Sequence, residues 1–187
     1  SYAMLLQNTA GEEMDLEGIM RQLMYISNVA QQYLRCSMAF YLDDKLPVPK
    51  MPDLWEKLLH MQGENVTLHS GVFRLKEAPR QPHIFRVPQI RTWNTLLKDG
   101  YPEAVKQEAM TLLDEMSARG EMNADSLRSF YQDFMQMIYF TVGGSEEKIH
   151  ELFYQPEALE LYRNGMKSVD EMKALIRYVT SSWTEHK

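Results

Sequence analysis

The sequence contains one cysteine, Cys36, and therefore cannot form an internal disulfide bond. It lacks an apolar run of about 18 residues, which excludes a membrane-spanning helix. It also lacks the basic and apolar stretches of an N-terminal secretory signal. A lone thiol is typical of proteins that fold in a reducing compartment. We therefore expect a cytoplasmic protein with no membrane partner.

The patterns that usually accompany catalysis are missing as well. No two of the five histidines lie three or four residues apart, and the sequence has no cysteine pair, glycine-rich phosphate loop or nucleophile elbow. Neighbouring carboxylates such as Asp114 and Glu115 point to different angles around a helix, so they are not placed for shared acid–base work. The sequence predicts no enzyme, no metal site and no cofactor. It predicts Cys36 to be a small core residue of an apolar strand rather than a reactive thiol.

The residues that are present fit a folded protein. The 187 residues are 44% hydrophobic and 25% charged, with a net charge of −6, which is ordinary for a chain large enough to bury a core. Residues 95–187 carry the whole of this negative charge, because acidic and basic residues balance in residues 1–94. A DNA-binding surface needs a positive field. We therefore expect no direct contact between this chain and nucleic acid.

The first part of the chain alternates between helix and strand patterns. Apolar residues recur at helical spacing over residues 12–34, and a short apolar strand pattern covers residues 36–42. Pro52 is suited to the first turn of a second helix, and Gly63 is expected to end that helix. A second strand falls within residues 65–75. These four segments predict a small α+β unit.

The boundaries between the parts follow from the prolines. Three prolines between residues 79 and 88 leave no room for a helix, so this stretch is expected to connect two parts of the chain. We expect a flexible N-terminus at 1–11 that includes residues left by recombinant expression, an α+β subdomain at 12–78, a Pro-rich connector at 79–92 and a helical subdomain at 93–187. The fold class is therefore α+β, predominantly α, in which a helix–strand–helix–strand unit is followed by a helical bundle.

Local signals mark the ends of several helices in the second half. Pro102 is expected to open one helix, Asn123 to cap the next, and Gly143 to end it. Ser145 is expected to cap a further helix. Ser168 and the glutamate three residues later match the capping box, in which each side chain binds a backbone amide near the other residue.

The helix expected after Asn123 is apolar on nearly all sides and rich in methionine and aromatic residues. Two interpretations are open. The excess apolar residues either complete the core of the subdomain or bind a partner helix, since methionine-rich surfaces adapt to partners. Under the second interpretation the candidate interface residues are Phe130, Phe134, Met137 and Tyr139, and the expected partner is a second copy of the chain. Glutamates at positions 134 and 137 should then give a folded monomer, whereas unfolding would assign both residues to the core.

Several runs of the sequence resemble one family, and they occur in the family's order. They are Trp93–Gly100, Ser126–Tyr139, His150–Phe153 and Ser168–Met172. With the strand and helix patterns upstream, the resemblance covers roughly residues 34–180. The chain resembles the middle region of AraC-type response regulators of two-component systems. These runs are packing motifs and carry no catalytic residues.

The resemblance implies a function in signal transduction. Such regulators carry a receiver domain that is phosphorylated on an aspartate, followed after the middle region by a pair of helix-turn-helix motifs that bind DNA. Both domains would lie in the same parent chain but outside this sequence, so that the parent protein binds DNA and this region does not. The expected function is a non-catalytic connecting and dimerisation region that relays receiver phosphorylation to the DNA-binding domain. The alternative is a small-molecule-sensing regulatory module in the α+β subdomain.

Overall fold

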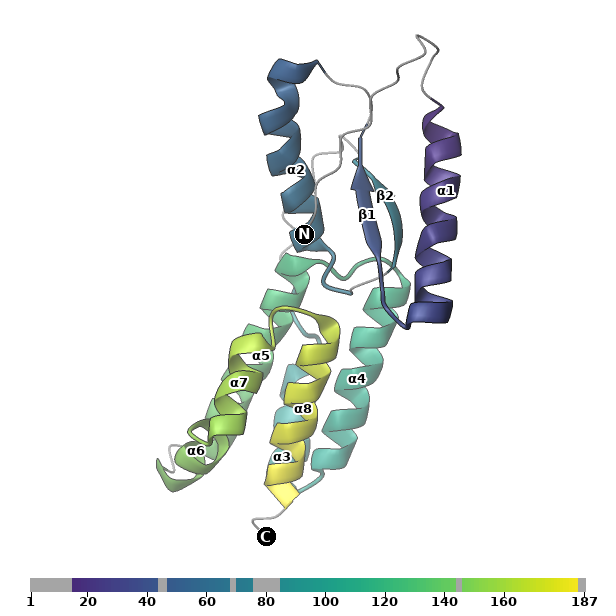
Figure 1. Ribbon diagram of the computed structural model, residues 1–187. Helices are drawn as coiled ribbons and strands as arrows, with labels where there is room; N and C mark the ends of the chain where they lie inside the picture. Colours follow the sequence, from purple (N-terminus) through teal and green to yellow (C-terminus); the bar gives the residue numbers. More distant parts are fainter. Residues whose placement is uncertain (1–14, 44–46, 68–69, 76–84, 144–145, 185–187) are drawn as a thin grey trace. The chain divides into compact units, whose positions relative to one another are not determined.

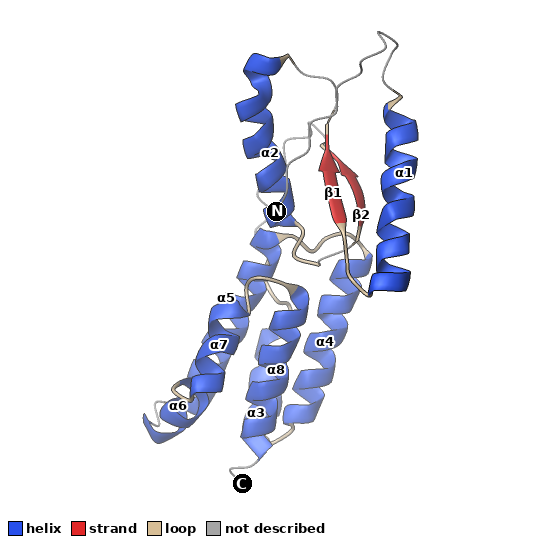
Figure 2. Ribbon diagram, in the orientation of Figure 1, coloured by secondary structure: helices blue, strands red, loops and turns tan. Residues whose placement is uncertain are grey.

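The computed structural model describes residues 15–43, 47–67, 70–75, 85–143 and 146–184. The chain divides into two compact units: unit 1 comprises Ser1–Met61 and His69–Lys76, and unit 2 comprises Gln62–Leu68 and Glu77–Lys187. Most of the described residues are helical, and two short strands form a parallel sheet (Figure 2). The predicted fold class, α+β and predominantly α, is confirmed.

Unit 1 follows the predicted order of helix, strand, helix and strand. Its elements are α1 (Leu16–Val29), a π-helical turn η1 (Ala30–Leu34), β1 (Ala39–Leu42), a 3-10 turn η2 (Val48–Lys50), α2 (Met51–Glu64) and β2 (Gly71–Arg74). The strands are parallel, with Ala39 opposite Gly71 and Leu42 opposite Arg74, and α2 forms the crossover that parallel strands require. Figure 1 shows α1 running along this strand pair, where it packs against β2.

Two local predictions in unit 1 are corrected. Cys36 is exposed rather than buried in a strand. Arg35 has a left-handed backbone with φ of 51°, which ends the helical segment. Cys36 therefore lies in the connection that follows, with its Sγ 3.9 Å from the carbonyl oxygen of Ala30, and the strand begins only at Ala39. Gly63 lies inside α2 rather than ending it, because the helix continues to Glu64.

Unit 1 buries little of its apolar surface. Among its described residues only Ser27, Ala30 and Gly71 are buried. The Ser27 hydroxyl donates a hydrogen bond of 2.9 Å to the carbonyl oxygen of Met38, which ties α1 to the start of the sheet. Large apolar side chains stay exposed on both helices, namely Met24, Tyr25, Ile26, Trp55 and Leu59. In the described part of unit 1, α1 packs against the sheet, but few side chains are buried and no continuous core forms.

The described residues of unit 2 form six helices. They are α3 (Ile90–Lys98), α4 (Pro102–Ala118), α5 (Ala124–Val142), α6 (Glu146–Phe153), α7 (Pro156–Asn164) and α8 (Val169–Thr184). In this unit α4 packs on α8, α3 on α5, and α7 on α8 (Figure 1). None of the described helices in the chain is long and apolar enough to cross a membrane.

Three predicted helix ends in unit 2 agree with the structure, and of the capping box predicted at Ser168 the structure shows the serine half. Pro102 is the first residue of α4, and Gly143 ends α5 with φ of 65°. Asn123 Oδ1 accepts a 2.9 Å bond from the amide of Ser126, whose hydroxyl accepts a 2.8 Å bond from the amide of Asn123. Ser168 Oγ accepts a 3.2 Å bond from the amide three residues later. The predicted cap at Ser145 lies outside the described residues.

The core of unit 2 is built around aromatic side chains. Trp93, Phe130 and Phe134 are fully buried. The ring centroids of Trp93 and Phe130 lie 6.1 Å apart in an edge-on arrangement, and those of Phe130 and Phe134 lie 6.4 Å apart. The indole Nε1 of Trp93 donates a 2.8 Å bond to Glu108 Oε2, so the polar atom of the buried ring is paired.

Two short segments belong to unit 2 although the sequence placed them elsewhere. Val66 is buried in this core, and its carbonyl oxygen accepts a 2.9 Å bond from the amide of Val169. The segment around it therefore groups with unit 2 rather than with the predicted subdomain at 12–78. Val87, from the predicted connector at 79–92, is also buried there, and its amide donates to Asp133 Oδ2 at 2.9 Å.

Candidate association surface

The structure corrects three of the four predicted interface residues. Phe130 and Phe134 are fully buried, and Met137 is only 3% exposed. All three lie on the side of α5 that faces the core of unit 2, so the core interpretation holds for them and they cannot meet a partner in this fold. Tyr139 is different, because it is 49% exposed.

The outward face of α5 carries a continuous row of exposed residues. We call this row the α5 stripe: Asp125, Arg128, Gln132, Gln136, Tyr139, Phe140 and Gly143. Spacings of three and four residues place these positions on one side of the helix. Phe140 is 67% exposed, and no charged residue occurs between Phe134 and Gly143. One half of the stripe is therefore aromatic and uncharged, while the other half carries a charged pair.

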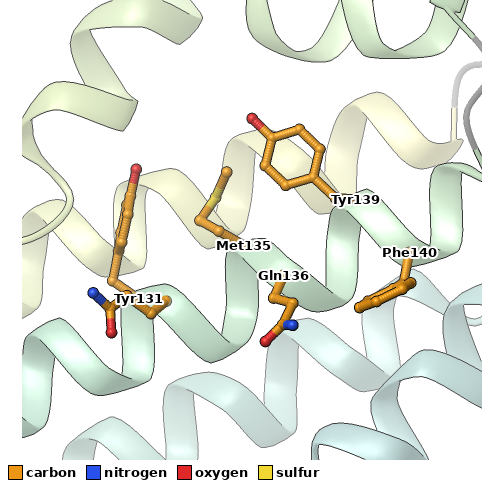
Figure 3. A pocket seen from close by; sticks show the side chains of 6 residues that line it. Tyr131, Met135, Gln136, Tyr139 and Phe140 are labelled. Atoms are coloured by element: carbon orange, nitrogen blue, oxygen red, sulfur yellow. The ribbon is translucent and has the colours of Figure 1, made fainter.

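An open depression lies along this helix. It has a volume of about 560 Å³ and is lined by Tyr131, Gln132, Met135, Gln136, Tyr139 and Phe140, all from α5. In Figure 3 the side chains of Tyr131, Met135 and Tyr139 project to one side of the helix, and those of Gln136 and Phe140 project to the other. Its polar groups are two amides and two phenols, none of them charged. Such a lining suits shape-dependent packing rather than the binding of an ion.

An aromatic stack supports the depression from the side of α6 and α7. The ring of Tyr139 lies 4.7 Å from that of Phe153, which lies 4.7 Å from that of Tyr162. The hydroxyl of Tyr131 donates a 3.2 Å bond to the carbonyl oxygen of Tyr162. These contacts fix the exposed ring of Tyr139 against buried neighbours, so this part of the surface is held in one arrangement.

Tyr131, which lines the depression, and Tyr162, which lies behind it, are neutral at physiological pH. Burial raises the pKa of Tyr131 and, more strongly, that of Tyr162, and neighbouring phenols add to both shifts. The Tyr162 hydroxyl is buried and has no hydrogen-bond partner among the described residues. The cluster therefore offers neutral hydroxyl groups and no acid–base pair that works near neutral pH.

Gly165 allows the ring of Tyr131 to pack closely. A Cβ atom at this position would lie 3.0 Å from Cδ2 of Leu175 and 3.1 Å from Cε2 of Tyr131. Both distances are shorter than normal carbon contacts. A side chain in this connection between α7 and α8 would therefore require Leu175 or the Tyr131 ring, which forms one wall of the depression, to shift.

Groups that could bind a metal do not come together in the described part of the chain. No three His, Cys, Asp or Glu side chains of the described residues are near enough to share an ion. His150 instead stacks on Tyr154, with 5.2 Å between the ring centroids.

The sequence identified Tyr139 but missed Gln132, Gln136 and Phe140. Their spacing of three and four residues places them on one side of a helix, but the sequence alone does not tell which side of this largely apolar helix is covered. Comparison with family models, with curated proteins and with solved structures found no match to this chain. The resemblance to the regulators therefore stays a prediction.

Proposed function

We propose that this chain is the non-catalytic connecting and dimerisation region of an AraC-type two-component response regulator. In this proposal it relays phosphorylation of a receiver domain to a DNA-binding domain, both in the same parent protein and outside this sequence. The structural observation that carries the proposal is the α5 stripe, an exposed surface that is aromatic and uncharged in one half, on a helix whose other side packs into the core of unit 2. The ordered resemblance over residues 34–180 supplies the family.

The packing of α5 suits a relay. The helix has a capping box at Asn123 and a left-handed glycine at Gly143, and its inward side is locked by Phe130 and Phe134. A signal changes the output of a protein by shifting the balance between two arrangements. A rigid helix with one uncovered face can contribute such a shift when that face gains or loses a partner.

The charge of the chain supports the proposal that another domain of the parent protein, and not this region, binds DNA. The helical half carries the whole net charge of −6, which disfavours contact with phosphate groups. In the proposal the DNA contacts therefore belong to the parent's helix-turn-helix domain, and the regulator acts in the cytoplasm. The depression lies on α5, outside residues 12–78, so it gives no support to the small-molecule alternative in the α+β subdomain.

The decisive experiment has two stages. The coding sequence on both sides of this region is determined first, and we expect a receiver with a phosphorylatable aspartate upstream and paired helix-turn-helix motifs downstream. The DNA affinity of the full-length parent is then measured with and without receiver phosphorylation. The same measurement is made on a version in which this region is replaced by a flexible Gly/Ser linker.

We expect phosphorylation to change the DNA affinity of the parent and to have no effect on the linker version. A reading frame without a receiver would overturn the proposal. A linker version that responds to phosphorylation as fully as the parent would overturn the relay role.

A further inference from the structure

We infer that the α5 stripe binds the α5 stripe of a second copy of this chain, with the two helices antiparallel and the two-fold axis on the outward side of α5, at the level of position 134 along the helix. This inference deepens the proposed function, since it names the partner and the geometry of its dimerisation step. It is carried by a property of the stripe itself, namely that all its residues except Tyr139 fall opposite another stripe residue when the helix is reversed, while Tyr139 falls opposite Ser129.

The complementarity is seen when two copies of the stripe are paired with their helices antiparallel. Position 134 is the midpoint between Asp125 and Gly143, so Gln132 of one copy lies opposite Gln136 of the other. Primary amides both donate and accept hydrogen bonds, so this pair satisfies itself on each side of the axis. Interfaces with two-fold symmetry need such a self-complementary surface.

The outer positions also match in this register. Arg128 lies opposite the exposed ring of Phe140, and a guanidinium over an aromatic face is attractive. Arg128 keeps its own partner, since its Nη1 is 3.6 Å from Asp125 Oδ1 in the same helix. At the ends of the stripe Asp125 lies opposite Gly143, whose lack of a side chain lets the backbones approach.

The charges favour the antiparallel direction over the parallel one. In a parallel pair with the helices in register, Arg128 would face Arg128 and Asp125 would face Asp125, and like charges placed opposite one another are destabilising. In the antiparallel pair no charged residue of the stripe faces a charge of the same sign. The helix dipoles, which run along α5, also attract each other when the helices are antiparallel.

The size of the stripe predicts a weak and reversible dimer. At 1.5 Å per residue the distance from Asp125 to Gly143 is about 27 Å, along one helix about 10 Å wide. One helix face of this size falls below the roughly 800 Å² per partner of a stable interface. We therefore expect an equilibrium between monomer and dimer that depends on concentration, which a change elsewhere in a parent protein can shift.

The test replaces Gln132 and Gln136, the pair nearest the two-fold axis, with charged residues. Sedimentation velocity is measured over a wide range of concentration for the wild-type chain and for three double variants. They are Q132E/Q136E, Q132K/Q136K and Q132K/Q136E. In the first two variants, positions 132 and 136 meet a like charge both in the proposed antiparallel pair and in a parallel pair in register. In the third variant, each introduced lysine meets a glutamate of the other copy only if the helices are antiparallel.

We expect the wild type to dimerise and the two like-charged variants to dimerise at least about tenfold more weakly. An equimolar mixture of these two should regain the association. Q132K/Q136E should dimerise at least as strongly as the wild type at low salt. The contact between the introduced lysine and glutamate within one helix competes little, because lysine stands on the less favourable N-terminal side of the pair.

The matched control is Q107E, which places the same charge on an exposed position of α4, and circular dichroism checks that each variant stays folded. A wild-type chain that is monomeric at every concentration would overturn the inference. So would a Q132E/Q136E variant that dimerises like the wild type, since the contact would then lie on another face. A monomeric Q132K/Q136E variant would overturn the antiparallel register.

Failure of this inference is distinguishable from failure of the proposed function. A monomeric chain whose full-length parent still couples phosphorylation to DNA binding contradicts only the α5 pairing. A parent without a receiver domain contradicts only the regulator, because α5 pairing is measured on the chain itself.

Discussion

Two phenylalanines on α5 provide a direct test of the fold, because they lie six residues apart on different sides of one helix, one buried and one exposed. Phe134 is fully buried in the core of unit 2, and Phe140 is 67% exposed. Phe134→Ala should lower the free energy of unfolding by about 3 to 5 kcal/mol, the usual cost of removing a buried ring and leaving a cavity. Phe140→Ala should change it by no more than about 0.5 kcal/mol. Both substitutions give the same change in helix propensity, so the difference reports burial alone.

The assay is urea unfolding followed by tryptophan fluorescence in a Trp55→Phe background. The remaining tryptophans, Trp93 and Trp183, both belong to unit 2, so the signal reports on that unit without a contribution from unit 1. A loss of about 3 to 5 kcal/mol is a large share of the roughly 5 to 15 kcal/mol that stabilises a typical domain. Phe134→Leu therefore serves as a milder variant if the alanine variant does not fold. Equal losses at the two positions would refute the assignment of α5's inner and outer faces.

Three further predictions concern local contacts in unit 2. Gly165→Ala should lower the melting temperature by the equivalent of about 1 to 3 kcal/mol, because the new Cβ would lie 3.1 Å from the Tyr131 ring. An unchanged melting temperature would contradict this close packing. The control is Gly63→Ala, whose Cβ would meet no atom within 4 Å. Asn123→Ala should cost about 1 kcal/mol in urea unfolding through loss of its capping bond, and Asn123→Ser should recover most of that cost. Burial raises the pKa of Tyr162, so its contribution to stability is complete below about pH 10 and is lost as the pH rises further, because the unfolded chain deprotonates first. In thermal melts above about pH 10, Tyr162→Phe should reduce the loss of stability with rising pH. At neutral pH it should raise the stability by about 1 kcal/mol, because the buried hydroxyl has no partner among the described residues. An equally steep loss of stability at high pH in the variant would contradict the buried position of the phenol.

Most of the local features of the fold were predictable from the sequence, although the helix end expected at Gly63 was wrong. Proline at the start of α4, asparagine before α5 and glycine after it act within one helical turn, so their neighbours in the sequence are sufficient to identify them. The β1–α2–β2 order was predictable for the same reason. The resulting fold class is confirmed, whereas the identity of the parent protein stays a prediction.

The features that depend on distant residues were not predictable. The burial of Val66 follows from a bond to Val169, about a hundred residues away, and no local pattern indicates it. Cys36 was misplaced because an apolar run of seven residues suggested a longer strand than the four residues that pair with β2.

The candidate site shows the same limit. A helix that is apolar nearly all round does not reveal which side is covered, and that depends on where α3, α6 and α7 pack. Of the four residues predicted to face a partner only Tyr139 is exposed, and the rest of the stripe is made up of Phe140, Gly143, two glutamines, Asp125 and Arg128. Glutamine is easily overlooked as an interface residue because it resembles any solvated position.

The sparse burial in unit 1 has a consequence for the order in which parts of the chain open. A parallel pair of four-residue strands that rests on one helix has few buried contacts to lose, and the free energy of local opening follows the number of such contacts. Backbone amides of β1 and β2 should therefore exchange their hydrogens with solvent well before those of α5. A perturbation that destabilises the whole chain should therefore open unit 1 first. The helices of unit 2 should keep their packing under the same conditions, so the α5 stripe should stay intact.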